Sequence, residues 1–340
     1  MNTKARAFLP IAIVASMALV VALSVCVPQD ALAKGSPWGA GTTYNAKSHT
    51  LTVKSGKHTI GTLSKVVKGK AYTIEKLVIK GGTTTVKLRY SPLQSLTVKG
   101  GKLKSKGQLS VSGKMKMMGG KALFSSTARE TNVLSVYDDF KMSGGKITVK
   151  TTKGNCGGIS VSGDMLVKKG TISITTKGKA ANGLHVNGFL KNVSGKLTMT
   201  TKGKNAYALR VGGDLLMKGG SIKAKASRGI AIRCTDLLKV TGGKLSAQSA
   251  ADKKAIDAGE KAVLKAKNLG KIKGQLPQGV QFAANGVTYR VTSSFSPTVS
   301  VVKGKTSAAT VRFGGVSYTI GKPGTSSQSS TMGQTGALGQ

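Results

Sequence analysis

The chain has 340 residues and is strongly basic, with 53 Lys and Arg residues against 11 Asp and Glu residues and a formal net charge of +42. So large a charge is not that of an ordinary, near-neutral secreted enzyme and calls for an anionic partner. With 3 cysteines, the chain is not a disulfide-stabilised scaffold. The length allows one large domain or two compact ones.

Residues 1–33 have the pattern of a secretory signal peptide. Lys4 and Arg6 precede an apolar run over residues 7–25, and the small residues Ala31 and Ala33 mark a cleavage site. Cleavage there would remove two basic residues and one acidic residue and would leave the secreted chain strongly basic. No second apolar run is long enough to cross a bilayer. We therefore expect a secreted protein without a membrane span, held at the cell wall, if at all, by its charge.

The three cysteines are not arranged as a disulfide framework. Cys26 lies in the signal peptide, and Val25 before it lacks the small size that a lipoprotein signal requires. Cys156 and Cys234 remain in the secreted chain, and we expect them to be buried thiols that are not joined to each other.

Residues 34–76 contain short runs of alternating apolar residues, such as 49–53 and 72–74. This alternation is typical of strands. Because the domain that follows is predicted to present an open sheet edge, we expect part of this segment to form a β cap over it.

An internal repeat fills residues 77–274. Units open with an apolar–x–apolar triplet, which two more short stretches of alternating apolar residues follow. Between these two stretches, several units have a Gly-Gly corner, such as Gly119-Gly120. The positions of successive triplets differ by 25 four times and then by 21. The six triplets begin at Leu109, Leu134, Ile159, Leu184, Leu209 and Ile230.

Three short strands per unit with glycine corners predict an all-β protein, a parallel β-helix whose coils stack about 4.8 Å apart. A left-handed helix prefers hexapeptide spacing, and neither interval is a multiple of six, so we expect a right-handed solenoid. The alternative, an antiparallel sandwich, requires hairpin turns at a regular spacing of about 8–12 residues. Asn-Gly pairs at 182, 187 and 285 do not have that spacing.

The C-terminal part changes character. Residues 247–268 are rich in Ala and Lys, which allows a helix, but Ile256 begins in register with the coils and favours a last coil. Residues 280–322 contain two similar alternating pieces, which predict a β-hairpin appendage or C-terminal cap. The Ser-, Thr-, Gly- and Gln-rich tail over 323–340 is predicted to be disordered.

Lysines recur at fixed places in the repeat. A Thr-Thr-Lys-Gly motif ends three consecutive units, and a second outward lysine precedes the third strand of several units. Stacking would bring such lysines one strand spacing apart, where they repel unless an anion lies over them. A simple solvated face would also accept glutamate, yet acidic residues are nearly absent. The predicted polyanion-binding residues are Lys121, Lys146, Lys153, Lys177, Lys196 and Lys202.

Acidic residues form a second, weaker pattern. Asp139, Asp164 and Asp214 have the same offset from their unit starts, and Asp236 falls one residue later. Asp139 and Asp164 would lie close together, as a Ca²⁺ site requires, but a turn-capping role or an ion pair with a lysine such as Lys114 explains them more simply. Ca²⁺ is therefore a weak candidate, and no other cofactor is expected.

The remaining chemistry-bearing residues do not form a recognisable site. His49, His58 and His185 have no ligand spacing with each other or with a cysteine, and no Ser/His/Asp set can be assembled. One tryptophan and few other aromatic residues argue against a stacking platform for single-stranded nucleic acid or a neutral glycan. An acidic polysaccharide or a cell-wall polyanion remains, with no specific nucleic acid.

In coil period and glycine corners, residues 77–274 resemble the bacterial secreted right-handed β-helix proteins of the pectate-lyase-like superfamily. The likeness is greatest to their non-catalytic carbohydrate-binding and adhesin-like members. In the lyases of that family, acidic ligands hold Ca²⁺ on a polyuronate and an Arg or Lys removes a proton. The resemblance implies as stand-ins the ligands Asp138, Asp139 and Asp164 and the bases Lys114, Lys141 and Arg210.

No motif assigns these roles, and the three clustered aspartates of the polygalacturonases cannot be placed. We therefore expect a non-catalytic β-helix that binds an acidic polysaccharide or cell-wall polymer through stacked lysines. A polysaccharide lyase or hydrolase on the same fold, and a surface adhesin that recognises protein, are the alternatives.

Overall fold

A computed structural model gives the fold of most of the chain. The described residues are 36–88, 92–127, 132–152, 155–250, 252–259, 261–265, 268–274, 276, 281–284, 287–291, 302–303, 309–313, 316–320 and 331–332. The predicted signal peptide, Cys26 and Lys153 lie outside them. The described part contains strands and no α-helix, so no helix in it is long and apolar enough to cross a membrane.

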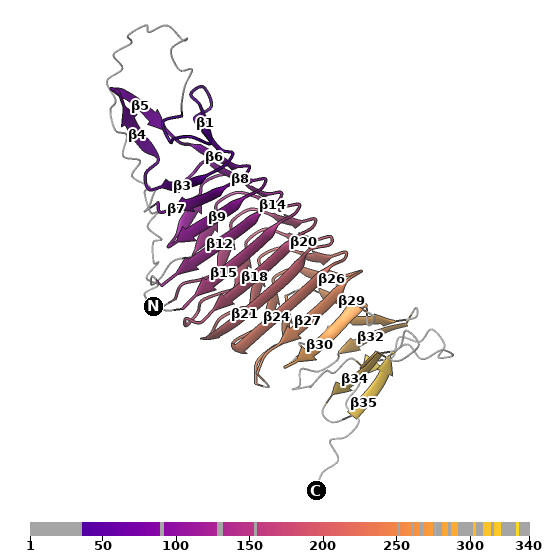
Figure 1. Ribbon diagram of the computed structural model, residues 1–340. Coiled ribbons are helices and arrows are strands. Elements are labelled where there is room, and N and C mark those ends of the chain that lie inside the picture. Colours follow the sequence, from indigo (N-terminus) through magenta and orange to yellow (C-terminus); the bar gives the residue numbers. More distant parts are fainter. Residues whose placement is uncertain are drawn as a thin grey trace, which may run out of the picture. The chain divides into compact units, whose positions relative to one another are not determined.

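The repeat folds into a parallel β-solenoid, as predicted (Figure 1). From β10 to β30 each coil contributes one strand to each of three sheets, and each strand pairs in parallel with the equivalent strand of the next coil. Leu134, for example, pairs with Ile159, and Ile159 with Leu184. The right-handed sense of the solenoid stays a prediction. The 7-stranded sheet consists of β10 (Leu109–Val111), β13 (Leu134–Val136), β16 (Ile159–Val161), β19 (Leu184–Val186), β22 (Leu209–Val211), β25 (Ile232–Cys234) and β28 (Ile256–Ala258).

The other two sheets are longer. The 14-stranded sheet runs β1 (Thr42–Asn45), β2 (Thr50–Val53), β6 (Lys76–Ile79), β8 (Ser95–Val98), β11 (Met115–Met117), β14 (Phe140–Met142), β17 (Met165–Val167), β20 (Leu190–Asn192), β23 (Leu215–Met217), β26 (Leu237–Val240), β29 (Lys261–Lys265), β31 (Gln281–Ala284), β32 (Val287–Val291) and β36 (Thr331–Met332). The 10-stranded sheet runs β3 (Lys57–Ile60), β7 (Thr83–Val86), β9 (Lys102–Lys106), β12 (Lys121–Ser126), β15 (Lys146–Thr151), β18 (Thr171–Thr176), β21 (Lys196–Lys204), β24 (Ser221–Arg228), β27 (Lys244–Gln248) and β30 (Leu269–Lys273).

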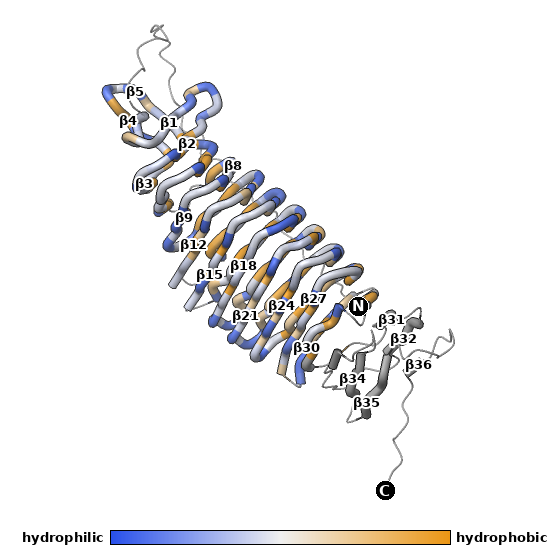
Figure 2. The backbone as a smooth tube through the Cα atoms, turned by 45° about the vertical axis from the view of Figure 1, so that its right-hand side comes forward, coloured by the Kyte–Doolittle hydropathy of each residue, from blue (hydrophilic) through white to orange (hydrophobic). Residues whose placement is uncertain are grey.

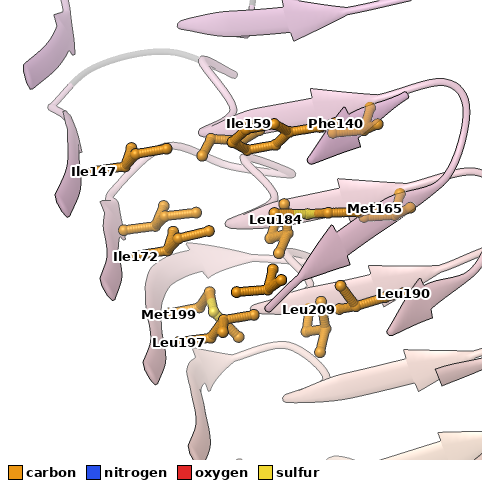
Figure 3. Packing of buried hydrophobic residues seen from close by; sticks show 14 of the residues in the cluster. Phe140, Ile147, Ile159, Met165, Ile172, Leu184, Leu190, Leu197, Met199 and Leu209 are labelled. Carbon is orange, nitrogen blue, oxygen red and sulfur yellow. The ribbon is translucent and has the colours of Figure 1, made fainter. Parts of the chain in front are cut away.

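The apolar residues of all three sheets meet inside the coils. Figure 3 shows Phe140, Ile147 and Ile159, one from each sheet, pointing toward the same interior, and Met165, Ile172 and Leu184 repeating this one coil further on. These side chains are buried. Along the tube in Figure 2, apolar and polar stretches recur in the same place from coil to coil. Burial of each large side chain contributes about 1.5–3 kcal/mol, so the repeated core is the main source of stability.

Glycine is needed at the corner between the 14-stranded and 10-stranded sheets because successive coils approach closely there. A Cβ on Gly119 would lie 2.4 Å from the carbonyl oxygen of Lys99 in the preceding coil. Gly120 has φ +71, and its Cβ would lie 2.6 Å from the oxygen of Gly101. The predicted Gly-Gly corners therefore reflect both backbone conformation and coil spacing.

One predicted unit start is wrong. Leu209 pairs with Ile232 and not with Ile230, so this step is two positions shorter than the regular period, and the next step, to Ile256, is one position shorter. Ile230 and Ile232 satisfy the same alternation, but Ile232 is the one directed into the core and Ile230 is half-buried. Ile256–Ala258 forms the last strand of this sheet, which confirms a last coil there rather than a helix.

Coil stacking begins earlier than the predicted boundary at residue 77. β2 pairs in parallel with β6, and β3 with β7, so residues 50–60 already form part of the solenoid. Before and between these strands lie β1, which pairs antiparallel with β2, and the hairpin of β4 (Ser64–Val67) and β5 (Lys70–Thr73). Trp38, Tyr44 and Tyr72 pack together in this region, with ring centroids 5.1–6.3 Å apart. Their capping role stays a prediction.

An antiparallel hairpin and a three-stranded antiparallel sheet follow the last coil, in the segment where the sequence predicts β-hairpin elements. β31 pairs with β32, and β34 (Ala309–Phe313) pairs with β35 (Val316–Ile320) and with β33 (Val302–Lys303). In the tail predicted to be disordered, Thr331 and Met332 are described and pair with β32.

Candidate polyanion-binding surfaces

Three lysines are stacked on adjacent strands of the 10-stranded sheet. Lys102 of β9 pairs with Lys121 of β12, which pairs with Lys146 of β15. We call these three residues the lysine column. Register partners on parallel strands lie about 4.8 Å apart, so the three lysine side chains project from the same face of the sheet at adjacent positions. Lys121 and Lys146 are exposed and Lys102 is half-buried.

Beyond the column, the same position alternates. Lys196 has Thr171 and Ser221 as its register partners, and Ser221 in turn pairs with Lys244. The prediction that Lys121, Lys146 and Lys196 share one outward position is therefore confirmed by the register, but only Lys121 and Lys146 are immediate neighbours. Lys196 is isolated from them by a threonine.

Further lysines surround the column on the same face. Every outward residue of β9 is a lysine, because Lys104 and Lys106 alternate with buried Leu103 and Ser105. Lys150 of β15 adds a charge on the same side. Among the described residues, none of these lysines forms an ion pair; the ion pairs there involve Asp139, Asp252 and Asp257. Sequence reasoning missed β9 because it lies closer to β12 along the chain than one regular period.

The Thr-Thr-Lys-Gly motifs are not all equivalent. Thr176 pairs with Thr201, so Lys177 and Lys202 occupy matching exposed positions directly after this pair. In the preceding coil Lys150, not Thr151, pairs with Thr175, so that motif is displaced by one residue. Lys153 lies outside the described residues.

The buried threonines that end β15 and β18 have a structural role. Buried Thr151 donates a hydrogen bond through Oγ1 to the carbonyl oxygen of Cys156 at 2.9 Å, and Thr176 donates to that of Ala181 at 2.7 Å. Among the described residues, Thr201 Oγ1 is buried without a hydrogen-bond partner. Thr151 and Thr176 therefore fix the turn into the next strand, and the adjacent exposed lysines Lys177 and Lys202 are available to a ligand.

The 14-stranded sheet presents a weaker basic face. Lys116 pairs with Lys141, and further along the same outward position Lys191 and Lys239 are separated by Leu216. Apolar neighbours accommodate the methylene stems of lysines, which makes this alternation a packed surface with dispersed charge.

The aspartates at matching offsets act as backbone caps. Asp139 accepts a hydrogen bond from the N–H of Asp164 at 3.1 Å, and Asp164 accepts one from Phe189 at 3.0 Å. Lys114 forms an ion pair with Asp139 at 3.2 Å, as the sequence indicated. The backbone hydrogen bond from Asp164, with this lysine, lowers the pKa of Asp139 below its ordinary value.

The same capping position corrects the placement of Asp236. Asp214 accepts a hydrogen bond from the N–H of Leu237, so Leu237 and not Asp236 is its equivalent in the next coil. Within the described ranges, no group of three His, Cys, Asp or Glu residues is arranged to hold a metal ion. Asp139 and Asp164 are thus adjacent, but each carboxylate is engaged with the chain.

Cys156 and Cys234 are buried thiols that are not joined to each other, which confirms the prediction. Burial raises the pKa of Cys234 to about 11, so this thiol stays protonated and unreactive near neutrality.

The 7-stranded sheet has a cluster of Arg and Tyr side chains that was not predicted from the sequence, where Arg210 alone was a candidate. Arg210 pairs with Arg233 in the next coil and with His185 in the preceding one. The guanidinium carbons of Arg210 and Arg233 lie 5.6 and 5.8 Å from the ring centroid of Tyr207. Burial and the charge of Arg210 lower the pKa of His185, which keeps this imidazole neutral at physiological pH. The shortened step between these two coils obscured the cluster in the sequence.

We compared the chain with known protein families, curated proteins and solved structures. No family model, no curated protein and no solved structure matches the chain. The fold and the surface chemistry therefore carry the functional argument.

Proposed function

We propose that this protein is a secreted, non-catalytic β-solenoid that binds an acidic polysaccharide or cell-wall polymer on the lysine-rich face of its 10-stranded sheet. The observation that carries the proposal is the lysine column, in which Lys102, Lys121 and Lys146 occupy adjacent register positions without an acidic partner among the described residues. The predicted signal peptide and the net charge of +42 support the same function.

The energetic argument starts from repulsion. Like charges directly opposite each other on neighbouring strands destabilise a sheet, and an array of them concentrates positive potential over one face. A repetitive anion laid across the strands would relieve this repulsion at several points and release counterions. Each exposed contact contributes only about 0.2–1 kcal/mol, so affinity depends on a polymer that meets many lysines together.

The aspartates support a non-catalytic role. A lyase or hydrolase mechanism requires carboxylates that are free to hold Ca²⁺ or to exchange a proton with substrate. Asp139 and Asp164 instead accept backbone hydrogen bonds from the neighbouring coil. We therefore assign them to coil stacking rather than to chemistry.

Removal of the column tests the proposal. The variant K102Q/K121Q/K146Q should bind polygalacturonate at least about tenfold more weakly than the wild type at low salt. The matched control K141Q/K191Q/K239Q removes the same charge from alternate strands of the 14-stranded sheet and should lose much less. Equal losses in the two triple variants would show that only net charge matters, and retained binding in the column variant would overturn the proposal.

A further inference from the structure

The Arg–Tyr cluster on the 7-stranded sheet has the construction of a discrete binding site. Its members come from two consecutive coils: Tyr207 and Arg210 from the turn and strand of one, and Arg233 from the strand of the next. Both guanidinium groups lie within 6 Å of the same ring centroid, which is the range of cation–π attraction. One aromatic ring thus holds two like charges close together.

Hydrogen bonds fix the platform in place. The backbone N–H of Tyr207 donates to Asn182 Oδ1 at 3.0 Å, which anchors the turn to the preceding coil. Arg233 Nη1 donates to the hydroxyl oxygen of Tyr207 at 3.3 Å. The ring and one arginine are therefore held before any ligand arrives, and a pre-organised site loses less conformational entropy on binding.

The two arginines differ in how the protein balances their charge. Arg233 has a long ion pair with its register partner Asp257, and Arg210 has none among the described residues. Asp257 Oδ1 is bound by Lys254 Nζ at 2.7 Å, while Arg233 Nε is 3.9 Å from Asp257 Oδ2. Within the described part of the chain, Arg210 has no ion pair and no hydrogen-bond acceptor, although its side chain is only partly exposed. Its planar N–H donors are thus oriented by Tyr207 and unused.

We propose that Arg210 and Arg233, supported by Tyr207, bind one oxyanion, a carboxylate or a phosphate, in a site separate from the lysine column. A guanidinium group matches both anions with two parallel N–H···O bonds, which an ammonium cannot reproduce. His185, the other register neighbour of Arg210, is uncharged near neutrality and adds polarity without a competing anion. The site lies on β22 and β25 and does not depend on the polymer-binding face, so either proposal can fail alone.

The test measures binding of small probes by isothermal titration calorimetry at about 0.15 M NaCl, where long-range charge effects are screened. Trigalacturonate presents carboxylates, glycerol 3-phosphate presents a phosphate, and maltotriose is the neutral comparison. We expect 1:1 binding of one of the two anionic probes and no heat from maltotriose. If neither anion binds the wild-type protein, the proposal is wrong.

Charge-conserving variants separate guanidinium geometry from charge. R210K/R233K should lose at least about tenfold in affinity for the probe that binds. Y207L keeps both arginines and should lose affinity as well, because the guanidinium groups are no longer oriented. R228K is the matched control, since Arg228 is exposed and its Nε donates to the carbonyl of Lys202 on the neighbouring strand. Unchanged affinity in R210K/R233K, or an equal loss in R228K, would overturn the proposal.

Discussion

Lys121 and Lys146 are direct register partners on the parallel strands β12 and β15, with both side chains exposed. Lys102 flanks Lys121 on the other side. In a protein with an ordinary surface, such a position would alternate in sign or carry neutral residues. Here three adjacent strands have lysine at this position, and the lysines repel one another.

The first prediction concerns the cost of this arrangement. Lys121→Gln removes the central charge and should raise the free energy of unfolding by up to about 1 kcal/mol. Lys196→Gln is the matched control, because Lys196 has Thr171 and Ser221 as neighbours in the same outward position. Urea denaturation at low ionic strength measures both. If the two substitutions have the same effect, repulsion within the column is negligible.

The second prediction uses two threonines that are register partners. Thr176→Val removes a hydroxyl bonded to the carbonyl of Ala181 and should destabilise the protein by about 1–2 kcal/mol. Thr201→Val removes a buried hydroxyl without a partner among the described residues and should be neutral or stabilising. Thermal unfolding of the two variants provides the comparison. A larger loss in Thr201→Val than in Thr176→Val would contradict the hydrogen-bond assignment.

The third prediction isolates coil spacing from backbone strain. Gly69 and Gly120 both have φ +71, but a Cβ on Gly69 meets no atom within 4 Å, whereas one on Gly120 meets the oxygen of Gly101 at 2.6 Å. Gly69→Ala should cost about 1–2 kcal/mol from the left-handed conformation alone. Gly120→Ala should cost several kcal/mol more, because the coils must move apart. Equal midpoints in urea would mean that the corner is more compliant than its geometry indicates.

The fourth prediction concerns acid stability. The pKa of Asp139 is lowered in the folded protein, so its stabilising contribution is complete above the unfolded value of 3.8 and is lost as the pH falls through the folded pKa. Asp139→Asn removes this titration. The difference in unfolding free energy between wild type and variant should be constant near neutrality and shrink below pH 3.8. A difference that does not change with pH would contradict the role given to Asp139.

The parallel fold could be predicted because a regular period fixes which residues stack. Leu134, Ile159 and Leu184 recur at that period with the same neighbours, and each is buried. Prediction failed where the period changed, since Ile230 and Ile232 satisfy the same alternation and only the fold selects Ile232. Length variation in the corners, not the strand pattern, thus limited the sequence interpretation.

The candidate sites were likewise predictable from the sequence only where the repeat is regular. The shared position of Lys121 and Lys146 follows from the regular repeat, but Lys102 is closer to Lys121 along the chain than one period and could not be aligned by that period. Arg210, Arg233 and Tyr207 lie across the shortened step, so their proximity depends on the corrected register. Buried Asn192 gave no signal either, although its side chain bonds Gly195 and Gly219 at a corner.

The salt dependence of polymer binding tests the central claim most directly. The protein from Lys34 onward would be titrated with polygalacturonate, teichoic acid, a sulfated glycan, duplex DNA and a neutral glucan at rising NaCl. The account predicts a linear fall of log K with log salt for acidic polymers and no glucan binding. It further predicts that one acidic glycan or wall polymer persists to higher salt than DNA. For that polymer, K102Q/K121Q/K146Q should reduce the slope by about 2, taking ~0.7 per contact. An unchanged slope in the triple variant, or simultaneous release of every polyanion, would contradict a site built on the lysine column.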